Sequence, residues 1–220
     1  MRLKSDFIDF YDHAFDSSMA DTPIFERLSE GGMNRRDILK FLDSVGLRTP
    51  IHGTVGEVTE KMLKELPSLP LNAIIKIWTV VVYVDENKHR GDGKLNISME
   101  EALKNYLDYY CTEFIPVLPS TGSMSMRYLQ VGKRKRWLRY WSSDWRSNYG
   151  RDVKIEVLCE EEKGYHPKIK YPLFAVDFLP ANKLYAVDFN IAPSLDPLKE
   201  LITPKEVVRE IEEFYKENQK

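Results

Sequence analysis

The most constraining feature of the sequence is the stretch YPLFAVDFLPANKLYAVDFNIA, residues 171–192, in which two apolar runs flank a short polar segment. Both runs alternate in the manner of β-strands, on which residues two apart share one face. In the first run Phe174, Val176 and Phe178 share a face, and Asp177 lies on the opposite one. The stretch therefore predicts a β-hairpin with one apolar, aromatic face.

The second run places its polar side chains on one face, in the set formed by Leu184, Ala186, Asp188 and Asn190. A turn at Asn182-Lys183 sets Asp177 directly across from Asp188, whereas a longer turn at Pro180–Lys183 shifts the register by two residues and keeps both on one face. Like charges this close destabilise a sheet unless they are neutralised, and carboxylate and amide oxygens suit Mg²⁺. We therefore expect Asp177, Asp188 and Asn190 to hold a divalent cation; the alternative is a solvated acidic face.

Composition says more about the size and cellular compartment of the protein than about its binding partners. At 220 residues, of which 43% are hydrophobic, the chain is large enough for one sizeable domain or two small ones. Its two cysteines, Cys111 and Cys159, are too few for a disulfide framework and lack metal-ligand spacing. The N-terminus has no signal-peptide pattern, and the longest apolar run, Ile77–Val84, has the length of a buried strand. We expect a soluble, cytoplasmic protein that does not act in a membrane.

Helix and strand signals alternate along the chain. Helices are expected where a capping residue precedes an amphipathic run: from Asn34 to Gly46, near Gly56–Glu65, from Ser98 to about Tyr110, and from Thr203 onward. Strands are expected at Ile74–Asp85, Leu95–Ile97, Arg127–Val131 and Arg136–Ser142, besides the hairpin, with Glu113–Val117 as a short strand or linker. Mixed elements joined mostly as antiparallel hairpins predict an α+β fold.

The segment HRGDGK, residues 89–94, is a basic, glycine-containing turn between two expected strands. Backbone N–H groups exposed at glycines, with Arg90 and Lys94 beside them, are suited to covering phosphates. The spacing matches neither a P-loop nor a dinucleotide-binding fingerprint, so an ordinary charged hairpin turn is the alternative.

Three arginines alternate with tryptophans in the second half of the chain, at Arg127, Trp137, Arg139, Trp141, Trp145 and Arg146. One interpretation is a basic, aromatic sheet that binds nucleic acid, and another is that long side chains cover an aromatic core. A third is that the arginines bind a substrate carboxylate or phosphate bidentately. The segment SSDWRSNYG, residues 142–150, favours the third, because it places Arg146 and Asn148 where a strand opens into a polar loop.

Taken in order, these motifs resemble the ATP-grasp superfamily over most of the chain, from about Asn34 to Leu198. The resemblance rests on VGLRTP (45–50), VVVYVDENKHRGDGK (80–94), TEFIP (112–116), RYLQVG (127–132), RYWSSDWRSN (139–148), AVDF (175–178) and AVDFNIAP (186–193). The later motifs are most similar to those of carboxylate–amine ligases that extend peptide tails. The resemblance implies an ATP-grasp-like fold of antiparallel sheets with flanking helices.

The resemblance also implies a division of the chain into an N-terminal extension, 1–33, and an ATP-grasp-like domain, 34–220. Within that domain a lid subdomain would cover about 74–112, and a metal-site subdomain would cover about 113–220. The extension is too short to be the complete domain that usually precedes the ATP-grasp unit and helps to bind the acceptor substrate.

The family pattern assigns roles to single residues. Adenine would contact Glu113 and the backbone of Phe114 and Ile115, and the phosphates would contact Arg90, Lys94 and Arg127. The acyl phosphate or carboxylate would contact Arg146 and Asn148. Mg²⁺ would be held by Asp177, Asp188 and Asn190. Two positions depart from the pattern. The family usually has a lysine at the end of the strand before the lid, which Lys76, Lys88 or Lys94 could replace, with Lys94 favoured, and Asp188 stands where glutamate is more common.

The expected function is an ATP- and Mg²⁺-dependent ligase that activates a carboxylate as an acyl phosphate for attack by an amine and releases ADP. Its substrates would be small-molecule or peptide carboxylates and amines, and a second copy of the chain or a partner protein would supply the acceptor site. The alternative is a catalytically inactive module on the same fold that binds nucleotides or proteins. Nucleic-acid binding is a weaker interpretation.

Overall fold

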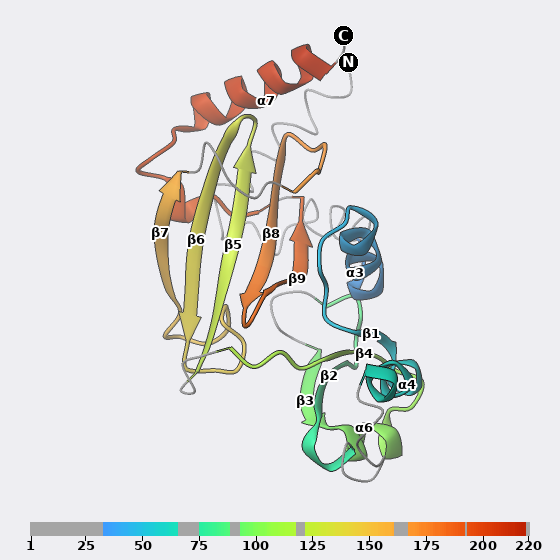
Figure 1. The fold of residues 1–220 in the computed structure, drawn as a ribbon. Helices are drawn as coiled ribbons and strands as arrows, with labels where there is room; N and C mark the ends of the chain where they lie inside the picture. The colour runs from blue at the N-terminus through green and yellow to red at the C-terminus, as the bar shows by residue number, and fades with distance from the viewer. Residues whose placement is uncertain are drawn as a thin grey trace.

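The structure, a computed structural model, describes residues 33–65, 75–88, 93–117, 122–160, 167–191 and 193–218. They form two antiparallel sheets with helices packed against them (Figure 1), which confirms the α+β prediction. One sheet has four strands in the order β1-β4-β2-β3, and the other has five in the order β7-β6-β5-β8-β9. Within these ranges no helix combines the length and the apolar character needed to span a membrane.

The four-stranded sheet carries helices on one face and turns its other face toward the larger core. Val80 and Val82 pack with α4 and α6, whereas Val81 and Tyr83, which alternate with them along β2, join the cluster that contains the five-stranded sheet. The elements of this region are β1 (His52–Thr54), α4 (Val55–Glu65), β2 (Thr79–Tyr83), β3 (Lys94–Ser98), α6 (Met99–Asn105) and β4 (Tyr110–Glu113).

Two predicted elements in this region were too long. The strand expected over Ile74–Asp85 covers only Thr79–Tyr83, because residues 75–77 form a helical turn and the pairing with β3 ends at Tyr83. The helix expected to reach about Tyr110 is capped by Ser98 as predicted but ends at Asn105, and Tyr110 begins β4. Short apolar runs do not distinguish helix from strand by their periodicity, so tertiary pairing decided both boundaries.

The five-stranded sheet is buried on both faces. Tyr128 and Phe174 pack with α3 on one face, and Leu129 and Leu173 pack with α7 and the segment before it on the other. The elements are α3 (Arg35–Ser44), β5 (Ser123–Val131), β6 (Arg134–Ser142), β7 (Lys154–Glu160), β8 (Leu173–Pro180), β9 (Leu184–Asn190), the 3-10 helix η2 (Asp196–Leu198) and α7 (Pro204–Asn218). The sequence analysis did not predict the edge strand β7.

Helix α3 begins and ends where the sequence predicts. The Asn34 side chain accepts the Asp37 N–H at 2.9 Å and caps the first turn. Gly46 has φ +77°, the left-handed conformation that glycine adopts at helix ends. The helix packs against β9, and its first turn therefore lies close to the second run of the hairpin.

The β8–β9 hairpin reaches the predicted pairing of Asp177 with Asp188 by a different route. Pro180 pairs with Leu184, so the turn has three residues, and a regular continuation of that register would set Asp177 opposite Val187. A β-bulge between the two register segments instead pairs Asp177 with Asp188, because one extra residue on a strand shifts the pairing by one position.

Because of the bulge, residues of β9 that were expected to share one face of the sheet lie in different environments. Ala186 is fully buried in the core beside Phe189, whereas Asp188 lines a pocket. The prediction that Leu184, Ala186, Asp188 and Asn190 share one face was therefore wrong, because the alternation of faces is reset at the extra residue.

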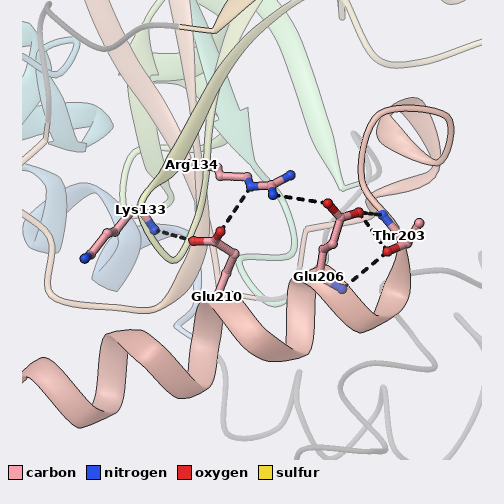
Figure 2. Close-up of polar contacts among 5 residues, drawn as sticks. All are labelled: Lys133, Arg134, Thr203, Glu206 and Glu210. Carbon is pink, nitrogen blue, oxygen red and sulfur yellow. Dashed lines mark hydrogen bonds and ion pairs between the residues drawn. The ribbon is translucent and has the colours of Figure 1, made fainter.

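Figure 2 shows how α7 is held against the turn between β5 and β6. Arg134 donates to Glu206 at 3.2 Å and to Glu210 at 3.1 Å, and the Lys133 backbone N–H donates to Glu210 at 3.3 Å. Thr203 and Glu206 bond to each other in both directions and cap the start of the helix. We call these five residues the helix cluster.

Candidate active site

A pocket of about 260 Å³ lies between the two sheets and gathers most of the residues predicted for a site. Its walls come from the small sheet, the segment after β4, the loop after β6 and the β8–β9 hairpin. The predicted residues that line it are Lys94, Glu113, Phe114, Ile115, Arg146, Asn148, Asp177 and Asp188. Arg127 contacts Asp177 beside the pocket, Asn190 lies two residues beyond Asp188 and is exposed, and Arg90 lies outside the described residues.

Asp177 is buried and paired with an arginine of the neighbouring strand. Arg127 lies opposite it in the β5–β8 register, and its Nε and Nη2 donate to the two carboxylate oxygens at 2.6 and 2.8 Å. The third nitrogen, Nη1, donates to the Tyr140 hydroxyl at 3.3 Å. Burial alone would lower the pKa of Arg127, but the Asp177 charge outweighs burial and the pKa is raised. Arg127 therefore remains a cation dedicated to Asp177.

Asp188 is paired with an arginine that the sequence analysis missed. Arg35 Nη1 lies 2.7 Å from Asp188 Oδ1, and the Arg35 side chain is only 2% exposed. Asp188 Oδ1 also accepts the backbone N–H of Phe189 at 3.0 Å. Burial opposes the charge of Arg35, but the Asp188 carboxylate outweighs burial and the pKa of Arg35 is raised. Each carboxylate of the hairpin pair therefore has its own arginine.

The Lys94 amine lies in an environment that disfavours its positive charge. It lies opposite Tyr83 in the β2–β3 register, and its amine is 5.7 Å from the centre of the Tyr83 ring. Burial of the amine, together with the nearby Arg35 charge, lowers the pKa of Lys94 to about 8, against the opposing effect of Asp188. Lys94 is therefore a cation near neutral pH and loses its charge in mildly alkaline solution.

The segment after β4 has some of its polar groups committed to the fold. Glu113 Oε1 accepts the Ile51 N–H at 2.9 Å, and burial raises the pKa of Glu113. The Phe114 N–H donates to the Thr79 carbonyl at 3.1 Å. A ligand at this wall would therefore meet the Phe114 carbonyl and the Ile115 backbone rather than the Phe114 N–H.

The loop after β6 presents Arg146 in a preformed arrangement. Its guanidinium donates to both oxygens of Asp144, at 2.8 and 3.0 Å, and lies 3.4 Å from the centre of the Tyr149 ring. The Ser147 hydroxyl donates to the Ser125 hydroxyl at 2.6 Å, which ties the loop to β5. Arg146 therefore enters the pocket wall as part of a fixed loop, with Asp144 as a bidentate carboxylate partner.

No protein-family model matches the sequence, and no curated protein matches it either. Among solved structures, the ATP-grasp ligase PsnB complexed with minimal precursor matches with a TM-score of 0.51 and 10% identity, over 83% of this chain and 62% of that chain. This chain has an ATP-grasp-like fold. It spans about 62% of the length of the PsnB chain.

Two further matches have lower scores. The D-cycloserine synthetase DcsG gives a TM-score of 0.49 at 8% identity, over 88% of this chain and 73% of that chain. A RiPP-associated ATP-grasp ligase from Chryseobacterium gregarium, in complex with ADP and a leader and core peptide, gives 0.47 at 15% identity, over 91% of this chain and 70% of that chain. The ATP-grasp-like fold rests on the match to PsnB.

The donors present at the acid pair suit a magnesium ion. In the described ranges no group of three His, Cys, Asp or Glu side chains is arranged to hold a metal, so the ATP-grasp-like set would consist of Asp177, Asp188 and the amide of Asn190. Carboxylate and amide oxygens are the ligands Mg²⁺ takes, and it needs few of them from the protein. Each carboxylate oxygen has two acceptor sites, so an arginine partner does not exclude a metal ion.

The spacing of Arg35 relative to apolar residues of α3 could have identified it from the sequence. Its position precedes Ile38, Leu39 and Leu42 by three, four and seven residues, and all four side chains are buried. That spacing defines one face of a helix, so Arg35 occupies an apolar-face position. A charged residue on the buried face of an amphipathic helix indicates a partner elsewhere in the fold, which here is Asp188.

Proposed function

We propose that this chain is an ATP- and Mg²⁺-dependent ligase, in which ATP phosphorylates a substrate carboxylate and an amine then displaces the phosphate to form an amide. The proposal rests on one observation. Residues expected separately to bind a purine, a phosphate, a metal ion and a carboxylate line the same pocket. They come from distant stretches of the sequence, and no local pattern requires them to meet. The ATP-grasp-like fold agrees with this class of reaction.

The wall formed by the segment after β4 suits a purine. Val81, Ile115 and Leu179 supply apolar side chains to the pocket. Because the Phe114 N–H is already bonded within the fold, the Phe114 carbonyl and the Ile115 N–H would contact the edge of the adenine ring. Glu113 would accept from the adenine amine with the oxygen that does not bond to the backbone.

The phosphates would lie toward Lys94, which we assign to the role of the lysine usual in the family. A buried ammonium is a compact point charge that binds phosphate well. Arg127 was expected to cover phosphates too, but its Nε and Nη2 donate to Asp177 and its Nη1 to Tyr140. We therefore assign Arg127 to hold Asp177 in position.

Asp177, Asp188 and Asn190 would hold Mg²⁺, which when bound offsets the charge of the ATP phosphates and polarises the phosphoryl group. The protein contributes orientation. Arg127 fixes Asp177 by two parallel hydrogen bonds, the geometry in which an arginine specifies the plane of a carboxylate.

Arg146 and Asn148 would bind the substrate carboxylate and the acyl phosphate formed from it. Arg146 already holds one carboxylate, that of Asp144, by two hydrogen bonds, so its geometry is the one that a substrate carboxylate or phosphate needs. Charge that develops during phosphoryl transfer is stabilised most by donors whose positions are fixed in advance, and the loop is fixed to β5 through Ser147.

A catalytically inactive nucleotide-binding module is the second candidate. The Asp144 carboxylate occupies Arg146 within its own loop, which favours a site in which this arginine serves the fold. The strand before the lid also ends in Tyr83 rather than in the lysine usual in the family. In this case ATP and Mg²⁺ would bind, but no carboxylate would be activated.

Calorimetric titration with ATP, with and without Mg²⁺, tests the nucleotide site. Wild-type protein should bind ATP more tightly with Mg²⁺, and Asp188→Asn should remove more than about 100-fold of that enhancement, because loss of even an outer-shell partner costs 10- to 100-fold. Adenosine should bind both proteins equally. Glu210→Gln, in the helix cluster, is the matched control and should bind as wild type does.

An Asp188→Asn protein that is folded and binds MgATP as wild type does would disprove the metal site. ADP release with pooled amino acids and peptides then separates the two candidates. Release that depends on a carboxylate and an amine supports the ligase, whereas binding of MgATP without release supports the inactive module.

A further inference from the structure

Arg35 is an arginine at a position where the packing of α3 calls for an apolar side chain. It shares its helix face with Ile38, Leu39 and Leu42, and its side chain is 2% exposed. Burying an ion pair brings little net stability, and well-packed apolar residues of similar size often serve as well or better. A methionine or leucine would complete this face at lower cost, so stability alone does not account for the arginine.

The contacts of Arg35 join three parts of the molecule. Its Nη1 lies 2.7 Å from Asp188 Oδ1 on β9, and its Nε donates to the Lys88 carbonyl at 3.3 Å. Its backbone N–H donates to the Glu86 carbonyl at 3.0 Å. Residues 86–88 follow β2, and Lys94 begins β3. One guanidinium therefore contacts both residues 86–88 and the carboxylate of Asp188.

The planar guanidinium makes this link rigid. It forms an ion pair with Asp188 and a hydrogen bond to the Lys88 carbonyl, so one planar group restrains the distance between them. Asp188 lies at the exposed side of its pair, with a side chain 25% exposed, and Arg35 together with the Phe189 N–H restrains its Oδ1. Partners of this kind orient metal ligands and raise metal affinity.

We propose that Arg35 is a positioning residue that holds Asp188 and residues 86–88 in one arrangement, and that it thereby sets the Mg²⁺ dependence of ATP binding. This inference rests on the proposed function, because it concerns the same pocket. Arg35 acts through Asp188 and does not itself contact ATP or the metal ion.

The test is a double-mutant cycle on ATP affinity, measured by calorimetry with and without Mg²⁺. Arg35→Met should reduce the Mg²⁺ enhancement about 10- to 100-fold, the usual effect of removing a group that orients a metal ligand. In the Asp188→Asn background the same change should have almost no further effect, because residues that act through one another are not additive. Arg35→Lys, which keeps a cation for Asp188 but not a rigid group that also reaches the Lys88 carbonyl, should recover only part of the loss.

The matched control is Arg36→Met in the next position of α3. Arg36 binds the Glu86 carboxylate through Nε and Nη2, at 3.2 and 2.9 Å, so the variant removes a contact to residues 86–88 without touching the Arg35–Asp188 pair. Because Arg35 acts on the metal site through Asp188, Arg36→Met should keep most of the Mg²⁺ enhancement, and a loss as large as that of Arg35→Met would contradict the role of Asp188. Adenosine affinity should be the same in every variant.

The outcomes separate this inference from the proposed function. Wild-type protein that does not bind ATP under either condition would overturn the proposed function, and the role of Arg35 with it. Wild-type protein that binds MgATP, with Arg35→Met equal to it or with losses that add to those of Asp188→Asn, would overturn the role of Arg35 alone. If Arg35→Met does not fold, Arg35→Lys and its cycle with Asp188→Asn decide the question.

Discussion

Two of the sets of arginine–carboxylate pairs in the described residues differ in burial. In the pocket, Arg127 holds Asp177 and Arg35 holds Asp188 at 2.6 to 2.8 Å, and the arginine side chains are 13% and 2% exposed. In the helix cluster, Arg134 holds two glutamates at 3.1 and 3.2 Å and is 28% exposed. Similar pairs therefore occur in two environments: the first set adjoins the pocket of about 260 Å³, whereas Arg134 lines only a small one of about 10 Å³.

The helix cluster has a mechanical role that accounts for it fully. It fastens α7 onto the β5–β6 turn (Figure 2), where Gly132 lies so close that an added Cβ would be 2.6 Å from the Glu210 carbonyl oxygen. The Arg127–Asp177 pair has no such task, because β5 and β8 are already paired in the sheet. Arg35 does join α3 to β9, but it does so with a charged side chain that is only 2% exposed. Buried charge beside a cavity costs free energy and is typical of functional sites, so the difference in burial agrees with the role proposed for the pocket pairs.

The largest expected effect comes from removing one partner of a pocket pair. Asp177→Ala leaves Arg127 buried without its carboxylate and should lower the free energy of unfolding by about 3–5 kcal/mol. It should also abolish Mg²⁺-dependent ATP binding. Urea denaturation and calorimetry measure the two effects, and Asp177→Asn, which keeps an acceptor for Arg127, provides a more stable variant for the binding experiment.

Glu210→Ala is the matched change in the helix cluster. Arg134 keeps Glu206 as a partner, so the free energy of unfolding should fall by only about 1–2 kcal/mol, and ATP binding should not change. Equal losses of stability in the two variants, or any change in ATP affinity in Glu210→Ala, would remove the distinction between the two sets.

The sequence predicted which residues meet at the pocket better than how the hairpin brings them together. Asp177 and Asp188 were predicted to pair because strand alternation and turn length constrain a hairpin, and they do pair. The bulge that achieves this was not predictable, since it depends on Ala186 and Phe189 both packing into the core. Arg35 was missed because its role depends on a contact with β9 that no local pattern contains.

The fold shows the same division between local and non-local signals. The caps at Asn34 and Ser98 bond to nearby backbone N–H groups, and both were predicted. The edge strand β7 was not, although Ile155 and Val157 alternate with Lys154 and Glu156, because such a short mixed run becomes a strand only by pairing with β6. Local hydrogen bonding is readable from sequence, whereas edge pairing depends on the sheet already present.

An intermediate effect is expected in how ATP affinity and stability depend on pH. The pocket should respond at alkaline pH and the helix cluster at acidic pH. Lys94 has its pKa lowered to about 8, so ATP affinity should fall as pH rises through about 8, approaching tenfold per pH unit where only the protonated lysine binds phosphate. Lys94→Met should bind ATP weakly at every pH, without this dependence. A wild-type affinity that stays constant between about pH 7 and 9 would remove Lys94 from the phosphate site.

The free energy of unfolding should rise with pH near the pKa of Lys94, whereas ATP affinity falls there. In the helix cluster the free energy of unfolding should change at acidic pH instead. The folded pKa of Lys94 is below its unfolded value, so the unfolded chain binds more protons between them and stability rises with pH through about 8 and above. Glu206 has its pKa lowered to about 2 by hydrogen bonds from Thr203 and Arg134. Its contribution is therefore present above about pH 4.3 and is lost as pH falls toward 2.

The smallest effect is expected at Lys133, where side chain and backbone have different tasks. The Lys133 amine pairs with Glu217, but both side chains are more than half exposed, and exposed pairs contribute little because water and salt screen them. Its backbone N–H, which Lys133→Ala retains, donates to Glu210. Lys133→Ala should therefore leave the urea midpoint unchanged, whereas Gly132→Ala next to it should lower the midpoint, because its Cβ meets the backbone of α7. A loss in Lys133→Ala as large as that in Glu210→Ala would mean that charge alone, and not the close approach of helix and turn, holds α7 in place.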